Sequence, residues 1–220
     1  MSSNQRYEIK RSKRKTIAIH ITPDGRVEVR SPYRVSKAII DEFVKSKGSW
    51  IDKHLTAINN RVKTPLVIGG SMLFLGKEYP LLENDGQSYF DGEAMYIQKG
   101  VDIYDVLAEF YRSKAKKLIP DMVHASEAVM GLNANKISIT SAKTRWGSCS
   151  GKNNLNFTWR LMMAEPEVIK YVIIHELAHI KEKNHGKRFW TLVEQYETEY
   201  KTKKEKLRHL AIRLDCDGWE

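Results

Sequence analysis

Apolar and polar residues alternate along parts of the first third of the chain, which is the spacing of half-buried β-strands. The alternation runs from Ile17 to Ile21, stops at Pro23-Asp24-Gly25 and resumes at Val27. Proline, aspartate and glycine favour turns because each adopts backbone conformations that strands do not use. The pattern therefore predicts a β-hairpin over residues 16–29.

Two helices and a further group of strands are predicted next along the chain. Ser36 can cap a helix whose apolar residues have helical spacing, and Gly48-Ser49 separates it from a second helix. Residues 60–65 have the composition of a linker. Short apolar runs separated by glycine, asparagine and aspartate then fill residues 72–98, which is typical of antiparallel strands. We therefore predict a β-rich domain over residues 1–100.

The apolar spacing changes to that of helices near residue 101. Asp102 is a suitable N-cap and Gly131 a suitable end for a helical region, while Pro120 between them predicts an end or a kink. Residues 136–140 then alternate like a strand. The second half of the chain is therefore expected to be richer in helices than the first.

A strand predicted over residues 155–159 precedes a strongly apolar helix. Pro166 suits the first helical position, and the buried stripe of this helix continues to Ile180. A last long helix is predicted to start near Gly186. A β-rich first domain followed by a second, more helical domain over residues 101–220 defines an α+β protein.

The composition narrows the class of protein further. Apolar residues make up 41% of 220, so the chain can bury a substantial core. Cys149 and Cys216 are too few for a disulfide framework. Residues 1–10 lack the apolar stretch of a secretory signal, and no stretch approaches the roughly 18 apolar residues of a membrane span. We therefore expect a soluble cytoplasmic protein without a membrane partner.

The formal net charge is +10, and the basic residues are densest near the predicted hairpin. The cluster consists of Lys10, Arg11, Lys13, Arg14 and Lys15. Such a cluster can bind the phosphates of nucleic acid or an acidic partner. A solvated flank of the hairpin is the simpler interpretation, because no known nucleic-acid-binding motif accompanies the cluster.

The residues with the clearest chemistry form the segment His175-Glu176-Leu177-Ala178-His179 on the predicted apolar helix. Residues four apart lie on the same face of a helix, so the two histidines can bind one metal ion. Glu176 lies beside them and can reach a water on the open side of the metal. This is the H-E-x-x-H arrangement of zinc-dependent peptidases.

A third metal ligand must come from outside this segment. His185 follows His175 by ten residues, which is the spacing of the metzincin motif, but Glu182 replaces the glycine of that motif and no methionine follows His185. Asn184 tolerates a left-handed backbone and is expected to end the helix. Glu199 is the competing ligand, at the spacing of thermolysin-like enzymes. We favour His185, because neutral imidazole binds zinc well and the short loop keeps it near the ion.

One zinc ion per chain, held by three protein ligands, leaves a fourth position for water. Zinc lowers the pKa of this water towards about 7 and polarises the substrate carbonyl, while Glu176 takes the proton and passes it to the leaving amine. The predicted function is hydrolysis of peptide or protein substrates. A chance match on an ordinary helix and a scaffold with a structural metal are the alternatives. Glu176 argues against the scaffold, because a structural site needs no base.

The residues that carry a family resemblance lie between 136 and 190. They are Thr144–Ser150 (Thr-Arg-Trp-Gly-Ser-Cys-Ser), Asn154–Leu161, His175–His179, Asn184-His185 and Phe189-Trp190. With them the chain resembles the YgjP-like predicted metal-dependent hydrolases, relatives of the SprT-like zinc proteases. The resemblance implies a minimal zincin-like catalytic domain with three histidine ligands and the glutamate as base. The relation to SprT-like proteases also implies an alternative function, a protease whose basic hairpin docks on DNA or RNA.

Three further residues are candidates for substrate binding. Arg145 can stabilise an oxyanion or hold a substrate carboxylate, although it can equally pin its own loop. Asn154 and Asn156 lie on a predicted strand that is either the sheet edge along which a peptide binds or an inner strand. Cys149 is interpreted as a structural thiol rather than a nucleophile. The lysines of residues 201–206 are interpreted as the solvated face of the last helix.

Overall fold

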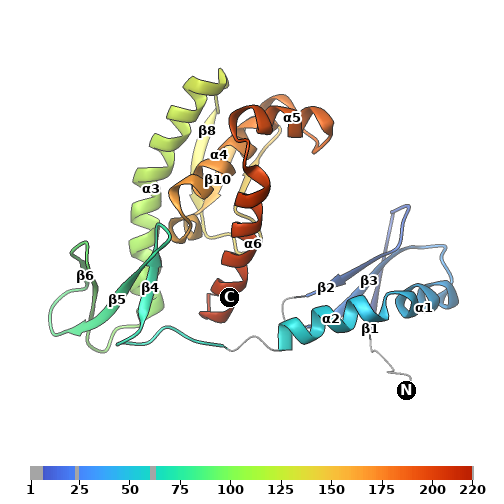
Figure 1. Ribbon diagram of the computed structural model, residues 1–220, viewed down its shortest axis with the longest axis horizontal. Coiled ribbons are helices and arrows are strands. Elements are labelled where there is room, and N and C mark those ends of the chain that lie inside the picture. Colours follow the sequence, from blue (N-terminus) through green and yellow to red (C-terminus); the bar gives the residue numbers. More distant parts are fainter. Residues whose placement is uncertain (1–6, 23–24, 60–62, 220) are drawn as a thin grey trace. The chain divides into compact units, whose positions relative to one another are not determined.

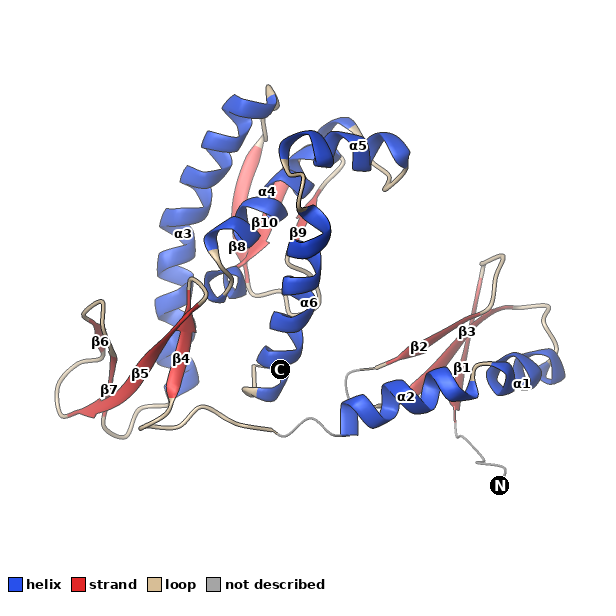
Figure 2. Cartoon of the chain, in the orientation of Figure 1, coloured by secondary structure: helices blue, strands red, loops and turns tan. Residues whose placement is uncertain are grey.

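The computed structural model of the chain describes residues 7–22, 25–59 and 63–219. The chain forms two compact units, Met1–Lys63 and Thr64–Glu220. Both units combine helices with strands (Figures 1 and 2), which confirms the predicted α+β class.

The first unit contains a three-stranded sheet in the order β1-β3-β2. Its strands are β1 (Tyr7–Ser12), β2 (Ala18–Ile21) and β3 (Val27–Pro32). Strand β2 pairs antiparallel with β3, which confirms the predicted hairpin, although Pro23 and Asp24 of its turn lie outside the described residues. The sequence pattern did not predict β1, which pairs parallel with β3 and makes β3 the central strand.

Two helices, α1 (Lys37–Ser46) and α2 (Gly48–Asn59), pack against this sheet. Ser36 caps α1 as predicted, because its Oγ accepts a hydrogen bond of 3.4 Å from the backbone N–H of Ile39. The core of the unit is apolar and small, and its fully buried members are Val29, Ile40 and Ile51. The first unit thus has its own hydrophobic core.

The second unit begins with a four-stranded sheet in the order β4-β5-β7-β6. Its strands are β4 (Ser71–Phe74), β5 (Lys77–Asn84), β6 (Tyr89–Phe90) and β7 (Met95–Gln98). Strands β5 and β7 are parallel, so the prediction of a wholly antiparallel meander is wrong at this pair. After β5 the chain first forms β6 at the edge of the sheet. It then returns as β7, which lies between β5 and β6.

These strands lie in the second unit, whereas the sequence analysis assigned them to a domain over residues 1–100. The physical reason is that their inward side chains share one core with the helices that follow. Met72, Leu81 and Ile97 are all buried in the same cluster as Leu107 and Tyr111 of the next helix. The division of the chain therefore falls between residues 63 and 64.

Helix α3 (Ile103–Met130) is continuous and long. Asp102 caps its start and Gly131, at φ 64°, closes its end, as predicted. Pro120 lies inside the helix, so the predicted end at this residue is wrong. Proline removes one backbone hydrogen bond, but buried residues continue with helical spacing on both sides of it, Ile119 before and Val123 after. Packing of that stripe keeps the helix intact.

A third sheet follows α3 in the order β8-β10-β9. Its strands are β8 (Lys136–Thr140), β9 (Gly147–Cys149) and β10 (Asn154–Thr158), and the 3₁₀ helix η1 (Trp159–Met163) continues from β10. Strand β10 pairs parallel with β8 and antiparallel with β9. It is therefore the inner strand, and β9 is an edge.

Three helices complete the second unit: α4 (Pro166–Lys181), α5 (Lys187–Tyr196) and α6 (Tyr200–Cys216). The predicted single last helix is thus two helices, separated at residues 197–199. Helix α4 contacts α3 on one side and α6 on the other (Figure 1), so it lies at the centre of the unit. None of the helices in the described parts of the chain is both long and apolar enough to span a membrane.

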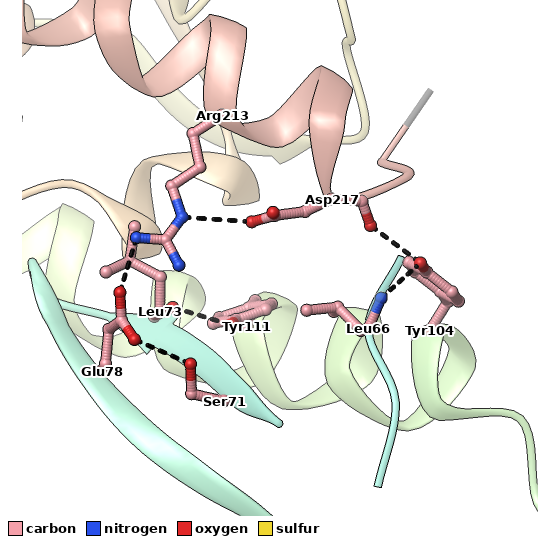
Figure 3. Close-up of polar contacts among 8 residues, drawn as sticks. All are labelled: Leu66, Ser71, Leu73, Glu78, Tyr104, Tyr111, Arg213 and Asp217. Carbon is pink, nitrogen blue, oxygen red and sulfur yellow. Dashed lines mark hydrogen bonds and ion pairs between the residues drawn. The ribbon is translucent and has the colours of Figure 1, made fainter. Parts of the chain in front are cut away.

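Polar contacts tie the end of α6 to the four-stranded sheet and to the start of α3 (Figure 3). Arg213 donates from Nη1 to Glu78 Oε1 at 2.7 Å and from Nε to Asp217 Oδ2 at 3.3 Å. The Tyr104 hydroxyl donates to the carbonyl oxygen of Asp217 at 2.7 Å and accepts from the backbone N–H of Leu66 at 3.0 Å. These contacts hold the carboxyl-terminal helix against elements more than 100 residues earlier.

Candidate metal centre

Helix α4 carries the first part of the site. Pro166 occupies its first turn, as predicted, and its missing N–H costs nothing there. Most residues of α4 between Val168 and Ala178 are buried, so packing on several sides fixes the position of the helix. His175 and His179 lie one turn apart, and their ring centroids are 5.0 Å from each other. The helical periodicity alone accounts for this pair.

The chain turns after α4 without a left-handed residue. Glu182 ends the helix with φ −120° and ψ 96°, and its N–H donates to the carbonyl of Ala178. The prediction of a left-handed Asn184 is wrong, because among the described non-glycine residues only Leu75 and Asn153 have positive φ. An extended backbone is open to any residue, which explains why this turn does not require the glycine that stands at the same position in metzincins.

The turn brings His185 back to the two histidines of α4. One ring nitrogen of each histidine lies within 4.8 Å of the others, and among the described residues these three form the cluster that could hold a metal ion. Nε2 of His185 is 3.0 Å from Nε2 of His175. Tetrahedral zinc with bonds of about 2.0–2.1 Å separates its ligand nitrogens by roughly 3.3 Å. Glu199, the competing candidate, is instead the residue preceding α6 and is not part of the cluster.

The protonation of the histidines suits metal binding. Nδ1 of His179 is 3.1 Å from the carbonyl oxygen of Glu182 and must donate to it, which leaves Nε2 free as a ligand. Burial, followed by the neighbouring histidines, lowers the pKa of His175 to about 3, and burial lowers the pKa of His179. Nδ1 of His175 is buried without a described hydrogen-bond partner. Neutral imidazole is the form that binds metal, so His175 and His179 fit a divalent ion, and the geometry of the cluster adds His185 to them.

The ring of Phe189, on α5, packs against all three imidazoles. Its side chain is fully buried, and its ring centroid lies 4.9 Å from His175, 4.5 Å from His179 and 4.7 Å from His185. The neighbouring Trp190 is 5.7 Å from His185. Aromatic packing of this kind restricts the imidazole rings to one arrangement, so α5 fixes the orientation of the candidate ligands.

Glu176 is buried beside the histidines, with 6% of its surface exposed. Burial raises the pKa of its carboxyl to about 7, so the group can both accept and release a proton near neutral pH. Gly147 of the edge strand β9 lies against it: a Cβ on residue 147 would stand 2.7 Å from Cγ of Glu176. Sequence reasoning missed this contact, although the Trp146-Gly147-Ser148 segment is among the residues that carry the family resemblance.

A cavity of about 730 Å³ opens beside this group. His175 and Glu176 line it together with Gly147 and with side chains from α4, α5 and α6. Tyr171 is one of them, and burial raises the pKa of its phenol to about 12, so the hydroxyl keeps its proton. Tyr171 stands four residues before His175, and that helical spacing was the signal that could have identified it.

None of the three predicted substrate-binding residues lines the cavity beside Glu176. Two of them line a second, smaller cavity of about 250 Å³. Arg145 is exposed and lines the smaller cavity with Asn156, whose side-chain nitrogen donates to Ser148 Oγ at 3.2 Å. The two cavities share Trp146 and Gly147. Asn154 lines neither. Because β10 is the inner strand, the alternative that it forms the substrate-binding edge is wrong, and the edge beside Glu176 is β9.

Two other sequence interpretations are refined by the structure. Burial raises the pKa of the Cys149 thiol, which disfavours a reactive thiolate and agrees with a structural cysteine. Lys203 is largely buried and donates to Glu197 Oε2 at 2.5 Å. The interpretation of the lysines of residues 201–206 as a purely solvated face is therefore wrong for Lys203.

The basic cluster of the first unit is partly used by the fold itself. Lys10 forms an ion pair with the buried Glu28. Arg11 donates from Nη1 to three backbone carbonyls between Pro32 and Val35, at 2.8–3.1 Å. Both residues therefore stabilise the sheet and its following turn, and binding of nucleic acid stays a prediction.

Three imidazoles and a buried carboxylate beside a cavity are the features of a metal-dependent hydrolase. Residues 15–210 match the family described as YgjP-like, metallopeptidase domain. The chain therefore belongs to the YgjP-like family of metallopeptidases, and a hydrolase with a divalent metal follows from that membership.

Two solved structures are similar to part of the chain. The metallopeptidase zymogen abylysin of Pyrococcus abyssi is 23% identical with a TM-score of 0.38, and the match covers 41% of this chain and 91% of that one. The metallopeptidase zymogen jannalysin of Methanocaldococcus jannaschii is 28% identical with a TM-score of 0.38, covering 42% of this chain and 96% of that one. No curated protein matches the chain.

Proposed function

We propose that this protein is a zinc-dependent peptidase that hydrolyses peptide bonds with Glu176 as its general base. The observation that carries the proposal is a cluster of three imidazoles next to a buried carboxylate, with His175 of the cluster and the carboxylate of Glu176 both lining one cavity. A structural metal site needs neither the carboxylate nor the cavity. The proposal therefore goes beyond metal binding to catalysis.

His175, His179 and His185 are the proposed ligands of one ion per chain. When bound, zinc supplies a Lewis acid that polarises a carbonyl and lowers the pKa of water. Glu176 accepts a proton from the attacking water and donates it to the leaving amine, and its pKa near 7 suits both steps. The protonated hydroxyl of Tyr171 lines the same cavity and is a better candidate than Arg145 for donating to the developing oxyanion.

The substrate backbone is proposed to lie along β9. Three observations support this placement: β9 is an edge strand, its Gly147 touches Glu176, and the two cavities meet at Trp146 and Gly147. An extended peptide can add to a free sheet edge through main-chain hydrogen bonds. Arg145 and Asn156 would then contact substrate residues on the side of the smaller cavity.

Metal content and cleavage of a broad peptide mixture, measured side by side, test this proposal. Glu176→Gln should retain zinc and lose at least about 10²-fold in cleavage rate, because only the proton acceptor is removed. His185→Ala should lose most of its zinc, whereas Glu199→Ala should keep both zinc and activity. Full cleavage by Glu176→Gln would refute the mechanism. Zinc loss in Glu199→Ala with retention in His185→Ala would refute the ligand assignment.

A further inference from the structure

One wall of the larger cavity is cationic. Helix α6 contributes Lys201, Lys204, Glu205 and Arg208 to its lining. The carboxylate of Glu205 is occupied, because Arg208 Nη2 lies 2.6 Å from its Oε1. Neither Lys201 nor Lys204 has an ion-pair partner within the described parts of the chain. Two ammonium groups at the cavity are therefore available to an anion.

Aromatic rings connect these two lysines to the histidine cluster. Nζ of Lys204 lies 5.4 Å from the ring centroid of Trp190, and Nζ of Lys201 lies 5.7 Å from that of Tyr200. The two rings are stacked with centroids 5.1 Å apart. Trp190 is also 5.9 Å from His175. The ammonium groups are thus held at an aromatic wall that ends at the proposed metal ligands.

The rest of the cavity lining is mainly apolar. Val172 and Leu207 contribute aliphatic surface, and Trp146 contributes aromatic surface. A ring face attracts an ammonium group through a cation–π contact, and this contact does not occupy all of the group's N–H donors. Each lysine therefore keeps N–H donors for an anionic acceptor. The combination of apolar walls with cationic donors fits a short aliphatic stem that ends in a carboxylate.

From this wall we infer that the protein selects peptides with a carboxylate close to the scissile bond, bound by Lys201 and Lys204. The inference rests on the proposed peptidase function. An aspartate or glutamate side chain and the free carboxyl terminus of a short peptide carry the same group. Both are therefore sources of the ligand, and the test distinguishes them.

The test compares peptides that differ only in the carboxylate. Matched pairs carry glutamate or glutamine next to the scissile bond, each with a free or an amidated carboxyl terminus. Binding is measured by fluorescence anisotropy with zinc-loaded Glu176→Gln protein, and kcat/KM with the wild type. We expect about tenfold tighter binding for the carboxylate peptides, equivalent to about 1.4 kcal/mol. Preference for internal glutamate identifies a side-chain site, and preference for the free terminus identifies a carboxypeptidase-like site.

The double substitution Lys201→Gln and Lys204→Gln, placed on the Glu176→Gln background for binding, should remove this preference. Binding of the amidated glutamine peptide, which offers the lysines neither a glutamate side chain nor a free terminus, should stay unchanged, because both lysines are exposed and no described ion pair is lost. Lys117→Gln, an exposed lysine of α3 outside both cavities, is the matched control and should keep the preference. Equal binding of the paired peptides, or a preference that survives the double substitution, would overturn the inference. Carboxylate-selective binding without any cleavage by the wild type would instead contradict the peptidase function.

Discussion

Gly147 of β9 lies against the side chain of Glu176 of α4, although the two residues are almost 30 positions apart in the sequence. A Cβ on residue 147 would stand 2.7 Å from Cγ and 2.8 Å from Oε1 of the glutamate. Real Cβ atoms do not approach other atoms so closely, so a side chain at residue 147 would force the carboxyl of Glu176 to move. The absence of a side chain at residue 147 therefore determines where the proposed base can lie.

Gly147→Ala should lower kcat/KM by about 10²-fold, because displacement of a catalytic group by about 1 Å has that effect. Zinc content should be unchanged, since the three atoms nearest to a Cβ on residue 147 all belong to Glu176 and none to the three histidines. Gly151→Ala is the matched control, because a Cβ there meets no atom within 4 Å. Steady-state cleavage and metal analysis of both variants decide the matter, and equal activity of the two would contradict the prediction.

The loop that carries His185 is tied to the turn before β10. Nζ of Lys183 donates to Oδ1 of Asn153 at 2.7 Å, and Asn153 adopts a left-handed backbone with φ 57°. Lys183→Met should weaken zinc affinity about two- to fivefold, because this exposed hydrogen bond restrains the loop only modestly. Competition with a zinc-binding dye measures the affinity. Lys181→Met, at the end of α4, should have no effect, and an equal loss in both variants would show that charge rather than the loop restraint is responsible.

Gly218 is required by the packing of the end of α6. It has φ 84°, and a Cβ on it would stand 2.6 Å from the hydroxyl oxygen of Tyr104, which bridges Asp217 and Leu66. Gly218→Ala should therefore cost the backbone strain of about 1–2 kcal/mol and a further 1–3 kcal/mol or so from overpacking.

Urea unfolding of Gly218→Ala and Gly100→Ala separates these two contributions. Gly100 has φ 80°, but a Cβ added to it would meet no atom within 4 Å, so its substitution should show the backbone strain alone. If the two variants lose the same free energy of unfolding, the contact with Tyr104 does not constrain residue 218.

Glu28 should make the first unit sensitive to acid. Hydrogen bonding to Lys10, the largest cause, holds the pKa of this carboxyl below its ordinary value in the folded state. Its stabilising contribution is therefore fully present above the unfolded pKa of about 4.3 and is lost as the pH falls through the lower, folded pKa.

The difference in urea midpoint between wild type and Glu28→Gln should accordingly shrink as the pH is lowered from 7 to 3. Glu8→Gln, on the neighbouring strand, controls for the loss of one carboxylate from an exposed position. A difference that stays constant over this range would show that the ion pair with Lys10 does not contribute to stability.

Sequence by itself determined the features that depend on local spacing. The caps at Ser36, Asp102 and Gly131 and the helix that presents His175, Glu176 and His179 follow from side chains within one or two turns of each other. The nearness of His185 also follows, because the short segment of chain after His179 cannot carry it far from that residue.

Tertiary structure decided the features that depend on packing between distant segments. The parallel pairing of β5 with β7, the passage of α3 through Pro120 and the division of the chain after Lys63 all follow from one shared core, which no local pattern encodes. The contact of Gly147 with Glu176 and the lysines of α6 at the cavity belong to the same class. A helix or strand is specified by neighbours in sequence, whereas a cavity and its charge are specified by whichever distant side chains the core brings together.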